Sequence, residues 1–99
     1  MARPGAKAEA QMLERLLRDL LAHDQVQVRP HGRHLVVDLL LADGPEPVAR
    51  LTKHKGDVYE AGFRNHTKRW EPLPAGGSME STARVLVETI GPFLDPDNY

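Results

Sequence analysis

The sequence contains no cysteine. Disulfide bonds, thiolate catalysis and cysteine-ligated zinc or iron–sulfur centres are therefore excluded. Long hydrophobic runs are also missing, because no stretch approaches the roughly 20 apolar residues that a membrane-spanning helix needs. Residues 1–13 lack the continuous apolar segment of a secretory signal. We therefore predict a cytoplasmic protein whose stability depends on side-chain packing.

Recognisable catalytic and cofactor motifs are absent as well. Ser78 has no GxSxG setting and is better explained as the N-cap of a helix. His31 and His34 form an HxxH pair across a turn, but two imidazoles without a third ligand hold zinc weakly. We therefore predict no metal and no cofactor. Enzyme activity ranks below two binding functions, because no acid, base or nucleophile can be named.

What the chain does contain is the composition of an ordinary globular domain. It has 99 residues, of which 40% are hydrophobic and 27% are charged. We predict a single domain over residues 1–99, with loose termini at residues 1–5 and 95–99.

Positive charge is concentrated in the middle of the chain. Residues 50–70 carry six Lys or Arg against two Asp or Glu, whereas residues 71–99 carry one against five. Residues 1–49 are nearly balanced, with six against seven. A basic middle beside an acidic end fits an anionic partner, or charge matching inside the protein.

Hydrophobic residues recur at helical spacing near both ends of the chain. The first predicted helix spans about residues 6–23, and its apolar stripe comprises Leu13, Leu16, Leu17, Leu20 and Leu21. The second spans about residues 79–90, and its stripe comprises Met79, Ala83, Leu86, Val87 and Ile90. Ser78 caps the second helix, and Gly91-Pro92 ends it. The first stripe covers only about two heptads, which favours a core-facing helix over a coiled coil.

Alternating and apolar stretches between the helices predict strands. A short strand at residues 26–28 is followed by a mostly apolar one at residues 34–41, and residues 48–70 form two further hairpins. The run PLPAGG, residues 72–77, is expected to be a linker. We predict an α+β two-layer sandwich: a helix, an antiparallel meander of four to five strands and a helix, with both helices on one sheet face.

The first hairpin of the 48–70 region has a predicted register. A three-residue loop at residues 54–56, with glycine in the left-handed position, is a common hairpin geometry. It places Lys53 opposite Asp57 and Arg50 opposite Glu60, two favourable charge pairs. The alternate residues, including Leu51, then face the core.

The second hairpin turns at residues 65–68. A loop of two or four residues there sets Phe63 opposite Trp70 on the core side of the sheet. It also sets Arg64 opposite Arg69 on the outer side, where the two like charges repel unless an anion intervenes. The position of Trp70 therefore depends on a one-residue choice of register.

Two helices on one face leave the other sheet face uncovered, and that face supports two functional hypotheses. The first is a small non-catalytic binding module that contacts an anionic partner such as nucleic acid or an acidic protein. Its candidate binding residues are Arg50, Arg64, Lys68, Arg69 and His66. The alternative is a protein–protein interaction domain that forms a homodimer through the same face. Its candidate contact residues are Val36, Leu40 and Val48.

Overall fold

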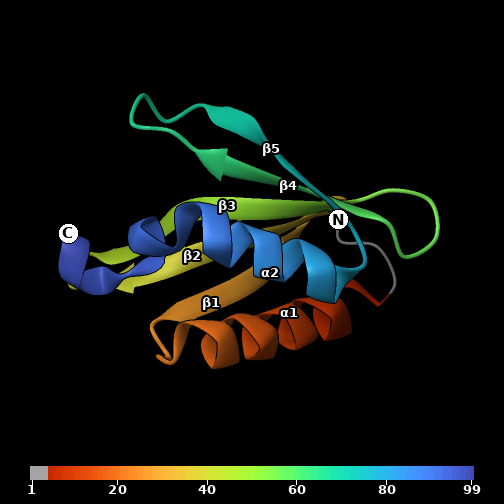
Figure 1. The fold of residues 1–99 in the computed structure, drawn as a ribbon. Helices are drawn as coiled ribbons and strands as arrows, with labels where there is room; N and C mark the ends of the chain where they lie inside the picture. The colour runs from red at the N-terminus through yellow and green to blue at the C-terminus, as the bar shows by residue number, and fades with distance from the viewer. Residues whose placement is uncertain (1–4) are drawn as a thin grey trace.

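The computed structural model describes residues 5–99, which fold into one sheet with helices packed on it. The elements are α1 (Ala6–Leu21), β1 (Val26–His31), β2 (His34–Leu41), β3 (Gly44–Lys53), β4 (Tyr59–Arg64), β5 (Trp70–Gly77) and α2 (Met79–Ile90), followed by 3₁₀ turns at Gly91–Leu94 and Pro96–Asn98. The strands form one antiparallel meander in the order β1-β2-β3-β4-β5. Both α-helices lie on the same side of it (Figure 1). The predicted α+β sandwich is confirmed.

The core lies between the helices and the inward face of the sheet. Each helix turns its predicted stripe to the core: Leu13 and Leu17 of α1 and Ala83, Leu86 and Ile90 of α2 are buried, and the other stripe residues are partly buried. The fully buried leucines are Leu13, Leu17, Leu35, Leu39, Leu51, Leu86 and Leu94. Burying each such side chain contributes about 1.5–3 kcal/mol relative to leaving it in water.

The ends of the helices follow their capping residues. Ser78 caps α2, and its side-chain oxygen accepts a hydrogen bond from the Ser81 backbone N–H at 3.2 Å, as predicted. α1 ends at Leu21, two residues before the predicted end, because Ala22 adopts the left-handed conformation with φ 59°. Neither α-helix of residues 5–99, at 16 and 12 residues, is long enough to cross a membrane.

The C-terminal residues 95–99, which are predicted to be a loose terminus, form side-chain hydrogen bonds in the structure. The Asp95 side chain caps the last turn by accepting from the Asp97 N–H at 3.0 Å. The Tyr99 hydroxyl donates to the Phe93 carbonyl at 2.7 Å. These side-chain bonds tie the end of the chain to the segment after α2. Of the predicted loose N-terminus, residues 1–4 lie outside the described part of the chain.

The register of the β3–β4 hairpin differs from the prediction by two residues. Lys53 pairs with Tyr59 and Arg50 with Gly62. The reason is that the three-residue loop lies one position later than predicted, at residues 55–57, where it is closed by a hydrogen bond from the His54 N–H to the Val58 carbonyl at 2.8 Å. A shift of two residues keeps every side chain on its face, so the predicted inner and outer faces of β3 and β4 are unchanged.

The register of the β4–β5 hairpin differs by one residue, which reverses the predicted faces of β5. Arg64 pairs with Trp70, and Phe63 pairs with Glu71. The predicted pairs of Phe63 with Trp70 and of Arg64 with Arg69 are therefore wrong. The Asn65 N–H donates to the Arg69 carbonyl at 2.8 Å, which leaves a three-residue loop instead of two or four. Trp70 consequently lies on the outer face of the sheet.

Residues 72–77 belong to β5 and are not the predicted linker. The strand pairs with β4 in register at Pro72, opposite Gly62, and an irregularity between Glu60 and Gly62 leaves Pro74 in an unpaired part of β5. Prolines are tolerated there because β5 is an edge strand, and an edge leaves alternate N–H groups without a strand partner.

Proline also explains where β4 leaves β3. The Leu40 N–H donates to the carbonyl of Gln25, the residue just before β1. Leu40 and Asp38 therefore direct their backbone N–H and C=O groups towards β1. Their partners on β3, Pro45 and Pro47, therefore face the side where β4 would continue. Neither proline has an N–H to offer. Pairing between β3 and β4 stops at Ala49 and Phe63, and the β4–β5 hairpin curls away from the other strands (Figure 1).

The free edge of β1 is covered by side chains of α1. Glu14 accepts a hydrogen bond from the Val28 N–H at 3.0 Å. Arg18 donates through Nε and Nη2 to the Val26 carbonyl at 3.1 and 3.0 Å. Pro30 is the next residue of β1 whose backbone faces away from β2, and it has no N–H. Two helical side chains thus take the place of a neighbouring strand.

Candidate functional site

The outer face of the sheet carries an aromatic–arginine pair at its centre. Arg50 of β3 lies over the ring of Trp70, with 4.6 Å between the guanidinium carbon and the ring centroid. Gly62 lies between them on β4, and a Cβ added there would meet the Glu71 carbonyl oxygen at 3.2 Å. The absence of a side chain at Gly62 leaves a shallow depression of about 130 Å³ beside Trp70.

The rest of this face is less open than its strand pattern suggests. Val36 is 5% exposed and Asp38 is 1% exposed. Val36 lies in register between Arg29 and Arg50, whose long side chains can cover an apolar neighbour with their stems. Arg29 also donates to Asp38, with Nε 2.8 Å from Oδ2.

The three candidate dimer residues expose little apolar surface. Val48 is 7% exposed, Val36 is similarly buried, and Leu40 is partly buried. An interface between two copies needs apolar surface that the monomer leaves accessible. These three residues do not supply it in the described part of the chain.

The structure divides the five candidate anion-binding residues into two groups. Arg50 is on the outer face, and Arg64 is the direct neighbour of Trp70 across β4 and β5. His66 and Lys68 lie at the tip of the hairpin and line a separate cavity on the other side, to which Arg64 also contributes. Arg69 precedes Trp70 by one residue, so alternation directs it away from the outer face.

Trp70 is the residue of this site that the sequence analysis missed. The signal that could have located it is Asn65. Its Oδ1 accepts from the N–H of Thr67 at 2.9 Å and of Arg69 at 3.0 Å. An asparagine that can bond its own turn in this way favours a loop beginning at residue 65. Such a loop pairs Asn65 with Arg69, and therefore Arg64 with Trp70.

Two histidines lie at the β1–β2 end of the outer face. His31 and His34 are cross-strand partners. The His34 Nδ1 is 2.8 Å from the Thr52 hydroxyl. Among residues 5–99, no group of three histidine or carboxylate side chains is arranged to bind a metal ion. Burial lowers the pKa of His34 below its ordinary value of 6.5, and the positive charge of Arg50 acts in the same direction.

This shift predicts a pH dependence of stability. A histidine whose pKa is lower in the folded state binds its proton more weakly than the unfolded chain does. The contribution of neutral His34 to the free energy of unfolding is therefore fully present above about pH 6.5 and is lost as the pH falls below that value. When urea unfolding is measured between about pH 7.5 and 5, His34→Gln is expected to reduce the dependence of the free energy of unfolding on pH. His66→Gln, at the exposed hairpin tip, is the matched control, and an equal flattening by both would contradict the assignment.

The fold and the site together define the chain as a small α+β domain with an open, arginine- and tryptophan-bearing sheet face. Comparisons with protein-family models, curated proteins and solved structures found no match to the chain.

Proposed function

We propose that the protein is a small, non-catalytic binding module that uses the open face of its sheet to contact an anionic partner, with single-stranded nucleic acid as the favoured class. The observation that carries the proposal is the position of Trp70 on that face against Arg50. Nucleic-acid bases stack on aromatic rings and arginine planes at open sheet surfaces. The cytoplasmic location predicted from the sequence belongs to the same proposal.

The surroundings of Trp70 suit a base and its phosphate. The depression beside the ring is kept free by Gly62. Arg50 lies over the Trp70 ring, and Arg64 is the register partner of Trp70 on β4. A guanidinium can bind a phosphate through two parallel N–H groups, which fixes the orientation of the strand.

Two acidic residues, Glu60 and Glu71, also line the depression, and the side chains of both have partners within the protein. The Glu60 Oε2 lies 2.9 Å from the His54 Nε2. Glu71 accepts a hydrogen bond from the Asn65 side-chain amide at 3.0 Å. Their local partners reduce their effect on an incoming phosphate without removing their charge. Glu60→Gln should therefore tighten binding of an anion.

A short single-stranded oligonucleotide of mixed sequence tests the proposal. Trp70 is the only tryptophan in the chain, so binding should quench the intrinsic fluorescence. With a labelled oligonucleotide and fluorescence anisotropy, Trp70→Ala is expected to weaken binding roughly 5- to 100-fold, because stacking on one aromatic ring is worth about 1–3 kcal/mol. Affinity should fall steeply with salt, and the double variant of Arg50→Ala and Arg64→Ala should reduce that slope.

Lys55→Ala is the control for loss of positive charge, since Lys55 is exposed in the β3–β4 loop away from Trp70. It should leave the affinity nearly unchanged. Absence of saturable binding at low salt, or equal affinity of Trp70→Ala and the wild type, would contradict the proposal. Light scattering of the protein alone addresses the homodimer alternative, since a dimer that Leu40→Glu converts to a monomer would favour dimerisation instead.

A further inference from the structure

A second concave site lies on the helix side of the sheet, where β4 diverges from β3. The cavity has a volume of about 400 Å³ and is enclosed by β3, the β4–β5 hairpin and the segment that follows α2. Cavities of about 300–1,000 Å³ are typical of sites for small ligands. The opening begins where pairing between β3 and β4 stops at Ala49 and Phe63, next to the register irregularity at Val48, and Pro45 and Pro47 beyond it offer no N–H to a continued β4.

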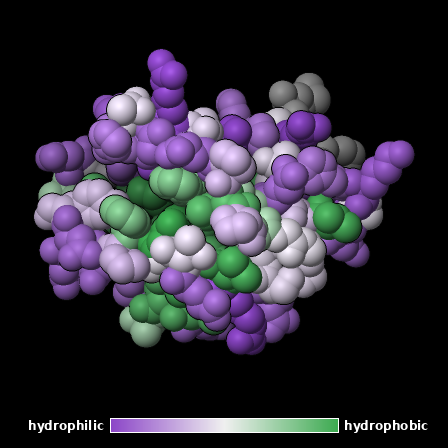
Figure 2. Space-filling model, turned by 45° about the horizontal axis from the view of Figure 1, so that its top comes forward, coloured by the Kyte–Doolittle hydropathy of each residue, from purple (hydrophilic) through white to green (hydrophobic). Residues whose placement is uncertain are grey.

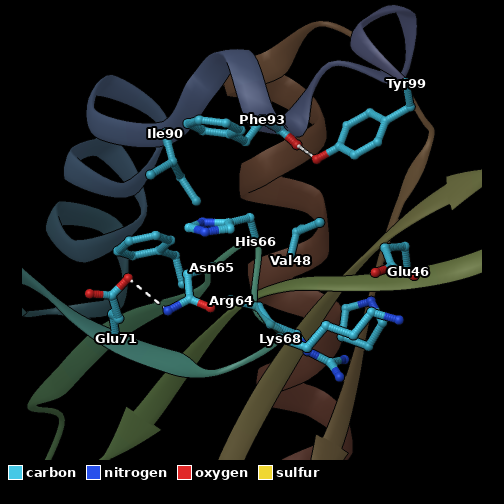
Figure 3. A pocket seen from close by; sticks show the side chains of 12 residues that line it. Glu46, Val48, Arg64, Asn65, His66, Lys68, Glu71, Ile90, Phe93 and Tyr99 are labelled. Atoms are coloured by element: carbon cyan, nitrogen blue, oxygen red, sulfur yellow. Dashed lines mark hydrogen bonds between the residues drawn. The ribbon is translucent and has the colours of Figure 1, made fainter.

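The cavity combines apolar walls with a basic hairpin tip. Val48, Phe63, Ile90 and Phe93 supply hydrophobic surface from separate elements. In Figure 3, Ile90 and Phe93 lie on one side and Lys68 on the other, with His66 and Val48 between them. A ligand that spans the cavity would therefore meet hydrocarbon at one end and positive charge at the other.

The surface around the cavity is already apolar in the free protein. Phe93 is 62% exposed although it is a large hydrophobic residue. Figure 2, in which the top of the Figure 1 view comes forward, shows hydrophobic side chains gathered near the middle of the surface and ringed by hydrophilic ones. An apolar patch with a polar rim on a small domain is typical of a binding site. A ligand in the cavity would remove part of Phe93 from water.

The hairpin tip is held in place before any ligand arrives. The Asn65 side chain accepts from Thr67 and Arg69 and donates to Glu71. Glu71 lines the cavity but already has this donor, and the other lining carboxylate, Glu46 of β3, lies at the same end of the sheet as the tip, because β3 runs antiparallel to β4. Arg64, His66 and Lys68 line the cavity together with these two carboxylates, and the Arg64 Nε is buried without a hydrogen-bond partner among the described residues, which favours an acidic group there.

We propose that this cavity binds a small amphipathic acid, with an apolar body against Phe63, Ile90 and Phe93 and a carboxylate beside Lys68 and His66. The site is distinct from the open sheet face, and its ligand is a small molecule instead of a polymer. The apolar walls provide most of the affinity through burial of hydrocarbon. The basic tip selects an acid over a neutral molecule of the same shape.

Octanoate and 1-octanol form a matched pair of probes, since they share the hydrocarbon chain and differ in charge. Titration of each into ¹⁵N-labelled protein should shift amide signals of residues 63–71 and 90–99. Octanoate is expected to bind at least several-fold more tightly than octanol. Lys68→Ala should lower the affinity for octanoate about 2- to 5-fold and leave octanol unchanged, as expected for an exposed charge pair. Phe93→Ala should lower the affinity for both probes.

Met12→Ala is the control for Phe93→Ala, because Met12 is 60% exposed and lies on α1, outside the cavity lining. Lys55→Ala is the control for Lys68→Ala. Equal effects of Met12→Ala and Phe93→Ala would show non-specific hydrophobic binding and overturn the proposal. So would octanol binding as tightly as octanoate, or the absence of saturable shifts at millimolar concentration. Octanoate should not displace an oligonucleotide from Trp70, which separates a failure here from a failure of the proposed function.

Discussion

Replacing Arg29 with alanine is expected to lower the free energy of unfolding by about 2–3 kcal/mol. Asp38 is 1% exposed, and Arg29 is its cationic partner. Removing the guanidinium leaves a buried carboxylate with the Gln27 amide as its remaining side-chain donor, at 3.1 Å. Hydrogen bonds to charged groups are worth about 1.5–3 kcal/mol, and breaking a buried pair costs about 3–5 kcal/mol. The partial exposure of Arg29 places the expected loss in the lower part of that combined range.

Urea unfolding at neutral pH measures this loss. Arg33→Ala is the matched control, because Arg33 is exposed in the adjacent β1–β2 turn and substitutions at such positions usually change stability by less than about 0.5 kcal/mol. Adding Asp38→Asn to Arg29→Ala should recover part of the loss, since the uncompensated charge is removed. If Arg29→Ala and Arg33→Ala have equal stability, the ion pair does not stabilise the fold.

Replacing Arg18 with alanine is expected to cost about 1.5–2 kcal/mol, the lower end of the range for a charged hydrogen-bond donor. Both of its hydrogen bonds end on the Val26 carbonyl, which has no neighbouring strand on that side. Alanine favours the helix slightly over arginine, and the ion pair of Arg18 with Glu14, at 3.8 Å, is a surface pair of small value, so most of the loss comes from the uncovered edge. Thermal or urea unfolding of the variant measures the effect.

Arg15→Ala provides the comparison on the same helix, because Arg15 is exposed there. Arg15→Ala should leave the free energy of unfolding nearly unchanged. Hydrogen exchange gives a second readout at the partner residue: Glu14→Ala should speed exchange of the Val28 amide, whereas Glu14→Gln, which keeps an acceptor oxygen, should do so less. Unchanged protection of Val28 in Glu14→Ala would refute the edge-covering role.

The sequence predicts the fold well because the signals for its elements are local and redundant. The leucine stripe of α1, the Ser78 cap of α2 and the run of apolar residues in β2 each specify one element. Two helices with one apolar stripe each can be satisfied on a single sheet face, which fixes the two-layer arrangement. None of these predictions depends on the exact register of a hairpin.

The candidate site is harder to predict because it depends on loop lengths. The β3–β4 loop begins one residue later than predicted, which shifts the register by two residues and leaves the faces intact. The β4–β5 loop differs by one residue, and this alone moves Trp70 from the core to the outer face. The cavity depends on contacts between distant parts of the sequence, since Phe63 comes from β4 whereas Phe93 and Tyr99 follow α2.

The prolines at the strand edges determine what kind of recognition is open to this protein. At Pro30 of β1 and Pro72 of β5, and along the part of β3 that β4 leaves free, an approaching peptide strand would find no N–H at the positions where it needs one. Recognition at these edges cannot rely on the main chain, which is common to all peptides. A partner must instead be distinguished by its side chains, bases or charges, so its own sequence and chemistry decide whether it binds.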